Sequence, residues 1–197
     1  MRKTNKNFLI TNYFECFRFL NESKNFIYTI IGIFFLFILV GSLVPAPLVL
    51  EEKILIFIEE LILSTEGMSQ SELVKFIFLN NIQASFFGLI FGLFFGIFPF
   101  ISTVINGYLV GYVAAKSVEM AGFLTLWNLV PHGIFELPAL FISLGLGLKL
   151  GTFIFEKDKV NTFKNYILNS LRVFFLVVLP LLIIAAIIEG SLIFLSR

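Results

Sequence analysis

The only histidine of the chain, His132, lies four residues before the carboxylate of Glu136, inside the motif PHGIFELPA at residues 131–139. With Pro131 in the first turn of a helix, where its missing N–H costs nothing, this spacing places both ionisable side chains on one helix face. Pro138 removes a backbone donor and clashes with the preceding turn, so the helix bends there. The surrounding sequence is apolar, and such a polar segment therefore needs partners from other helices.

Three roles are open for the His132–Glu136 pair. The first is a buried hydrogen-bond network that fixes helix register, with Glu136 bonded to His132 or to Lys116. The second is a pathway for an ion, a proton or a small solute, because intramembrane carboxylates and broken helices recur in such pathways. The third is a metal site, although the absence of HExxH and of a second histidine disfavours a zinc hydrolase. We expect no cofactor, apart from a cation that His132 and Glu136 could hold.

The composition indicates an all-α integral membrane protein. Of the 197 residues, 58% are hydrophobic, 14% are charged and 27 are phenylalanine, and the mean hydropathy is +0.99. Soluble domains carry about a quarter charged residues, so this chain has too few charges to cover a soluble surface. Its one cysteine, Cys16, excludes an internal disulfide and a cysteine-based zinc site.

Five apolar segments have the length of about 20 residues that a bilayer-spanning helix needs. They form a single polytopic domain over residues 26–197, with spans at 26–44, 76–98, 101–118, 132–151 and 173–195. Residues 1–25 are basic and carry apolar residues at helical spacing, which predicts a cytoplasmic amphipathic helix on the membrane surface or against the bundle. Residues 48–64 alternate apolar blocks with pairs of glutamates, which predicts an in-plane helix on the other side.

The charge asymmetry of the connections predicts the orientation. Five spans place residues 1–25 and the 152–172 connection on one side, and both are basic. The segment 45–75 lies on the other side, with six glutamates and two lysines. The positive-inside rule then puts the N-terminus in the cytoplasm and the C-terminus outside the plasma membrane. A re-entrant fourth segment would change this parity.

This orientation gathers most of the intramembrane polar residues near the outer surface. Four helices supply the predicted cluster, in which Asn106 alone belongs to the inner half: His132, Glu136, Asn80, Asn81, Gln83, Lys116, Glu189 and Asn106. A charge at mid-bilayer costs at least about 2.5–3.5 kcal/mol, so these groups are expected to pair with one another or to line an aqueous cavity.

Small residues recur at every fourth position in three of the spans. The stripes are Gly88, Gly92 and Gly96; Gly107, Gly111 and Ala115; and Ala139, Ser143, Gly147 and Gly151. Lipid provides no hydrophobic force between helices, so small residues that allow close backbone approach hold such bundles together. We predict that the glycine faces of the second and third spans meet as an antiparallel hairpin that turns at Pro99, and that the fourth span packs on it. One stripe could instead serve a homodimer.

Other catalytic patterns are missing from the sequence. Asp158 is its only aspartate, which excludes a Ser–His–Asp triad inside the membrane, and no GxxxxGK[ST] loop is present. No segment is long enough to form a separate soluble domain. We therefore predict no enzymatic activity and no nucleic-acid partner.

The motif at residues 131–139 resembles the hallmark of the stage II sporulation protein M family of multi-pass membrane proteins. Asn80-Asn81, Asn106-Gly107 and the glycine-rich run to Pro99 resemble the same family, over roughly residues 70–151. In spore-forming bacteria the resemblance implies a membrane anchor for two peptidoglycan-cleaving partners, and it implies no catalytic residues. Relatives in bacteria that do not sporulate, and in archaea without peptidoglycan, imply that the family is not confined to sporulation.

These patterns together favour a non-enzymatic membrane scaffold or anchor for proteins of cell-envelope or membrane remodelling. Besides the lipid bilayer, its expected partners are proteins that dock at the acidic outer segment 48–72. The alternative is a small channel or transporter with an ion or proton site at the kinked helix that carries His132 and Glu136.

Overall fold

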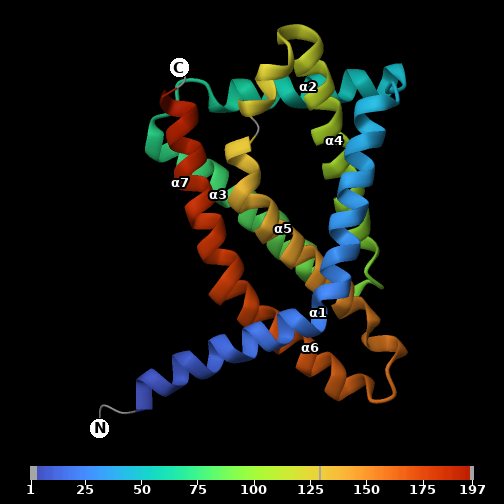
Figure 1. Ribbon diagram of the computed structural model, residues 1–197, viewed down its shortest axis with the longest axis vertical. Helices are drawn as coiled ribbons and strands as arrows, with labels where there is room; N and C mark the ends of the chain where they lie inside the picture. Colours follow the sequence, from blue (N-terminus) through green and yellow to red (C-terminus); the bar gives the residue numbers. More distant parts are fainter. Residues whose placement is uncertain (1–3, 129, 196–197) are drawn as a thin grey trace.

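The computed structural model describes residues 4–128 and 130–195, and every regular element within these ranges is helical (Figure 1). The main helices are α1 (Thr4–Leu43), α2 (Leu48–Thr65), α3 (Gln70–Ile90), α4 (Ile97–Ala121), α5 (Val130–Gly151), α6 (Lys159–Val173) and α7 (Leu179–Leu195). Short 3-10 segments cover Phe91–Leu93, Phe123–Asn128 and Thr152–Phe155, and a π-helical turn covers Phe174–Val178.

Among the described residues, five helical segments are long and apolar enough to cross a membrane, which confirms the predicted all-α membrane protein with about five spans. They are Ile10–Leu43, Gln70–Leu93, Ile97–Ala121, Gly133–Phe155 and Lys159–Leu195. Figure 1 shows α2 across one end of the bundle, and α6 with the first part of α1 at the opposite end. We refer to these as the α2 end and the α6 end.

The predicted surface helix 1–25 and the first span belong to one continuous helix, α1. No proline or glycine interrupts residues 4–31, so nothing in the backbone ends the helix between its amphipathic and apolar parts. In Figure 1 the first part of α1 runs crosswise at the α6 end before the remainder rises along the bundle. The helix ends at Leu43, just before Pro45, and Pro47 is the N-cap of α2.

Helix α3 begins at Gln70, six residues before the predicted start of the second span. The backbone N–H of Ser69 donates to the Glu72 carboxylate at 2.9 Å, and the Ser69 hydroxyl donates to the same oxygen at 2.7 Å. The first of these bonds is one half of a capping box, in which the Ser69 side chain also accepts from the Glu72 backbone N–H, and it satisfies donors that a helix start leaves without partners. The earlier start moves Asn80 and Asn81 from the outer part of the span, where we predicted them, toward the middle of α3.

The turn between α3 and α4 lies earlier than predicted. Phe95 and Gly96 adopt positive φ angles of 57° and 71°, and the chain reverses there rather than at Pro99. Pro99 is buried in the first turn of α4, where a missing backbone N–H costs no hydrogen bond.

The predicted polar connection 152–172 contains helix α6. Asp158 caps it, because its carboxylate accepts hydrogen bonds from the side chain of Asn161 at 2.6 Å and from the backbone N–H at 3.2 Å. These bonds lower the pKa of Asp158 below its ordinary value. A π-helical turn then leads into α7 just before Pro180, which cannot donate a backbone hydrogen bond.

Helix α5 is the centre of the bundle. In its apolar window 61% of the residues are buried, against 17–33% in the other four spans. It packs against α1, α3, α4 and α7. Around it lie two apolar clusters, one with Phe34 and Phe141 at an edge-to-face ring distance of 5.0 Å and one that joins Leu89 and Leu146 to the start of α7.

The glycine stripes pack differently from our prediction. Gly88 of α3 and Gly92 of the 3-10 segment that follows it face Leu144 and Gly147 of α5, and not α4. The stripe of α4 faces α1 instead: a Cβ on Gly107 would lie 2.6 Å from the carbonyl oxygen of Phe34, and Gly111 lies against the backbone of Ile38. The predicted hairpin with facing glycines is therefore wrong, and α5 lies between α3 and α1.

A methyl group added to Gly92 or Gly111 should destabilise the protein strongly, because each would meet backbone atoms of the neighbouring helix. We expect Gly92→Ala and Gly111→Ala to lower the free energy of unfolding by about 1–3 kcal/mol or more. Gly32 is the matched control, since a Cβ there meets nothing within 4 Å. Thermal unfolding of the three purified variants in detergent tests this; equal losses in all three would contradict the packing.

Candidate functional site

A polar cavity of about 110 Å³ lies inside the bundle between α3, α4 and α5. Its lining residues are Asn80, Asn81, Ala84, Ser85, Asn106, Glu136 and Leu140. A water molecule occupies about 30 Å³, so the cavity has room for a few waters or for an ion with part of its hydration shell. Four of the eight residues of the predicted polar cluster thus surround one space.

The cavity residues reach this space from consecutive turns of three helices. Asn81 and Ser85 project from one face of α3, since positions four apart are neighbours on a helix, and Asn80 and Ala84 form the adjacent pair. Ser85 is buried, whereas Asn80 is exposed at the rim. Asn106 enters from α4, and Glu136 from the first turns of α5.

The amide of Asn106 has a fixed orientation. Its Nδ2 donates to the backbone oxygen of Ser102 at 2.8 Å and lies 3.3 Å from the Ser102 hydroxyl. The amide nitrogen of Asn106 is therefore bonded to its own helix. Asn106 was predicted in the inner half, apart from the other amides; because α3 starts earlier than predicted, it lies level with them.

The remaining members of the predicted cluster lie elsewhere. Gln83 is exposed on another face of α3. Glu189 is buried on α7 where that helix meets α3, next to Gly190, which packs against Val74. The side chain of His132 lies outside the described residues, so its pairing with Glu136 stays a prediction.

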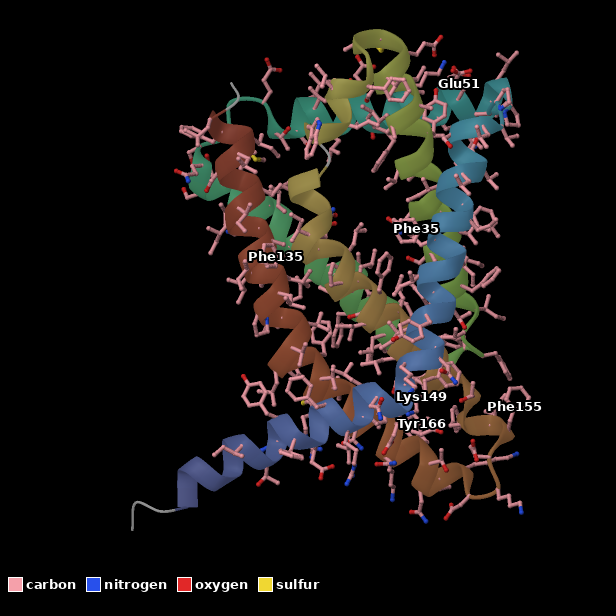
Figure 2. The ribbon with its side chains drawn as sticks, viewed as in Figure 1. Phe35, Glu51, Phe135, Lys149, Phe155 and Tyr166 are labelled. Atoms are coloured by element: carbon pink, nitrogen blue, oxygen red, sulfur yellow. The ribbon has the colours of Figure 1, made fainter. Side chains whose placement is uncertain are left out.

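Lys116 does not reach Glu136; it binds α2 to α4. Its Nζ lies 3.2 Å from a carboxylate oxygen of Glu51 and 3.6 Å from one of Glu119, and the Tyr112 hydroxyl donates to Glu51 at 3.0 Å. Figure 2 shows Glu51 at the α2 end, far from the middle of α5. The hydrogen bond from Tyr112, followed by the hydrogen bond and charge of Lys116, lowers the pKa of Glu51. Lys116, one of the two partners considered for Glu136, therefore pairs with Glu51 and Glu119 instead.

Sequence reasoning missed a buried cation, Lys149, at the α6 end. Its Nζ donates to the Ser23 hydroxyl at 3.0 Å and lies 4.1 Å and 5.0 Å from the ring centres of Phe19 and Tyr166. Figure 2 shows Lys149 and Tyr166 together where α1, α5 and α6 meet. The two aromatic rings and the Ser23 hydroxyl stabilise the ammonium group. The signal was a single charge within the small-residue run GLGLKLG, where a lysine needs a special environment.

Comparison with known protein families identifies the family of this chain. The family model described as Stage II sporulation protein M matches residues 26–192. The chain belongs to the stage II sporulation protein M family. No curated protein and no solved structure shows significant similarity to it.

The match to the stage II sporulation protein M family covers most of the features described above. It begins in α1, after the crosswise first part, and ends within α7. Within it lie the cavity, helix α2 with its clamp to α4, and Lys149. The match thus covers parts or all of the five apolar segments of this chain, whereas residues 4–25, the amphipathic first part of α1, precede it.

The clamp between Glu51 and Lys116 should make the attachment of α2 depend on pH. Because the pKa of Glu51 is lowered, the stability that its ion pair with Lys116 gives to the attachment of α2 is complete above the ordinary glutamate pKa near 4.3. This stability is lost as the pH falls through the lowered pKa. We expect Lys116→Met to raise hydrogen exchange of the α2 amides about two- to fivefold at neutral pH, as acid does in the native chain. Lys53→Met, on exposed α2 surface, is the control; equal exchange in both variants would refute the clamp.

Proposed function

We propose that this member of the stage II sporulation protein M family is a non-enzymatic membrane scaffold that holds partner proteins through helix α2. The observation that carries the proposal is the exposure of this helix. Although rich in leucine and isoleucine, α2 has a single buried residue, Ile54. The ion pair between Glu51 and Lys116 attaches α2 to α4 across the end of the bundle. Most apolar side chains of α2 are exposed.

One face of α2 has the pattern of a helix-binding surface. Val49, Ile56 and Leu63 follow one another at intervals of seven residues and are 67%, 48% and 60% exposed. Seven residues are close to two helical turns, so the three side chains form one stripe. Exposed carboxylates of Glu52, Glu59 and Glu60 flank it. We call these six residues the α2 surface.

The charge of the α2 surface favours a protein over a lipid headgroup as its partner. Helices that bind the membrane surface carry lysine and arginine, because they meet anionic lipids. The α2 surface carries carboxylates around its apolar stripe and therefore matches a partner helix with an apolar stripe flanked by lysine or arginine. This suits an anchor for envelope-remodelling proteins, which is the role that the family resemblance implies.

The charge distribution supports an orientation with the α2 end outside the plasma membrane. The α6 end carries basic residues of α1, of α6 and of the loop before it, among them Arg18, Lys24, Lys157, Lys159, Lys164 and Arg172. The α2 end carries the six glutamates of the 45–75 segment. By the positive-inside rule the α6 end faces the cytoplasm, and the α2 surface is then presented to partners on the outer side.

The packing below the cavity supports a scaffold rather than a channel or transporter. Between the cavity and the α6 end, α3 and α5 approach through Gly88, Gly92 and Gly147. The side chains around this contact are the buried Leu89 and Leu144. Apolar side chains and touching backbones offer an ion or a proton no polar route through this part of the bundle.

A photo-reactive residue at Ile56 tests the scaffold in living cells. We expect it to crosslink to a protein segment that combines apolar residues with lysine or arginine. The triple change Glu52→Lys, Glu59→Lys and Glu60→Lys should abolish the adduct, because it places like charges across the contact. The matched control Glu156→Lys, at the α6 end, should leave it unchanged.

The identity of the crosslinked segment, read by mass spectrometry, allows a reciprocal check. Acidic substitutions in that segment should restore the adduct with the triple lysine variant. An adduct that survives the triple change, or adducts with lipid alone, would contradict docking at the α2 surface.

A further inference from the structure

We infer that the turn between α3 and α4, residues 91–99, is embedded among the acyl chains of the lipid leaflet at the α6 end, and that a groove beside it holds a phospholipid acyl chain. Helices α3 and α4 enter from the α2 end and return to it, so the proposed orientation is unchanged (Figure 1). The inference does not depend on the α2 surface, which lies at the opposite end of the bundle.

The turn lacks the polar residues that are typical of turns in water. Residues 86–101 contain no polar side chain, and Ser85 and Ser102 are the first polar residues on either side. Asn, Asp and Ser are common in aqueous turns because their side chains hydrogen-bond to nearby backbone, and Asn and Asp tolerate positive φ angles. Here Phe95 has a φ of 57° and is 64% exposed. A phenylalanine at such a position indicates hydrocarbon around the turn rather than water.

The backbone of the turn is paired within the protein. The N–H of Phe94 donates to the carbonyl oxygen of Phe91 at 3.1 Å, that of Gly96 to Gly92 at 2.8 Å, and that of Ile97 to Phe94 at 3.0 Å. Lipid offers no hydrogen-bond partner, so irregular backbone at membrane depth needs such internal bonds.

Helix α5 covers the same backbone from one side. Gly92 lies against the backbone of Gly147, and Gly96 lies against Leu148. Both glycines are buried, whereas the neighbouring Phe94 and Phe95 are exposed. Irregular backbone occurs at membrane depth where protein covers it, and this turn presents only apolar side chains outward.

An apolar groove of about 420 Å³ runs beside the turn. It continues into the outward surfaces of both spans, since Phe87 of α3 stacks on Phe91 at 5.5 Å and the exposed Ile105 lies one helical turn after Ile101 of α4. These surfaces face acyl chains in a membrane, so an acyl chain is the occupant that matches the groove. Its lining residues are all apolar: Phe91, Phe94, Ile97, Phe98 and Ile101.

The charges of the α6 end lie beyond the turn. Gly151, the last residue of α5, packs against Gly96, and Figure 1 shows the following loop and α6 further toward this end than the turn. That loop and α6 carry the exposed Lys157, Lys159 and Lys164, none of which forms an ion pair with a carboxylate of the described residues. Such lysines match the phosphates of lipid headgroups, which places the headgroups beyond the turn and the turn among the acyl chains.

Fluorescence quenching of the full chain in proteoliposomes tests the inference. Trp127, the one native tryptophan, is first changed to phenylalanine, and Phe94→Trp then reports on the groove. We expect this variant to lose most of its fluorescence when the acyl chains carry bromine, and to lose little to acrylamide, a quencher dissolved in the water. Lys157→Trp, in the loop before α6, is the matched control and should show the opposite response.

A second variant, Phe98→Trp, also lies in the groove and keeps the test decisive should Phe94→Trp fail to fold. The inference is overturned if acrylamide quenches the groove variants as strongly as the control, since the turn then reaches water. It is equally overturned if neither quencher acts on them, because a protein segment or a second copy of the chain then covers the groove.

Discussion

The close approach of helix backbones to α5 is the interaction on which the rest of the structure depends. Gly145 lies against Ile27 of α1, Gly147 against Gly88 and Leu89 of α3, and Gly151 against the turn that follows α3. In lipid no hydrophobic force drives helices together, so dispersion contacts at short distance must do so. Because these glycines point to different sides of α5, one helix can hold α1 and α3 at the same time, which explains its high burial.

This packing also determines where polar groups can lie. The face of the second span that meets α5 carries Gly92 and Gly88 toward the α6 end and Ser85 and Asn81 toward the α2 end. Small residues on this face are thus followed by polar ones. The backbones touch at the glycines, and the cavity opens one turn further along, where side chains replace them. Helix α5 thus brings Glu136 to the cavity with its first turns and buries Lys149 at its other end.

The five spans could be predicted because the length of an apolar run is enough to identify a transmembrane helix. The helix that each glycine face contacts could not be predicted, because the stripes of the second and third spans are alike in sequence. A short connection also does not require the two helices that it joins to pack face to face. The start of α3 could be predicted from the Ser69–Glu72 capping pattern, whereas hydropathy alone places the boundary six residues too late. That shift of six residues also misplaced Asn80, Asn81 and Asn106 relative to one another.

The partners of charged residues were the least predictable part. Lys116 and Glu136 both belong to predicted spans, but Lys116 lies near the end of α4 and a long side chain can reach Glu51 outside the bundle. Lys149 needed two aromatic rings and a hydroxyl from α1 and α6, and α6 itself was expected to be a polar connection. Such pairings depend on how each helix is rotated about its own axis. A span that carries apolar residues on every face does not specify this rotation.

Disulfide formation between α3 and α5 in native membranes tests the central packing most directly. A Cβ on Gly88 would lie 3.6 Å from Cγ of Leu144, so Gly88→Cys combined with Leu144→Cys, in a chain with Cys16→Ala, places two thiols within bonding reach. The account predicts rapid disulfide formation under mild oxidation for this pair, and none when Gly88→Cys is combined with Gly107→Cys of α4. A disulfide between α3 and α4, with none between α3 and α5, would contradict it.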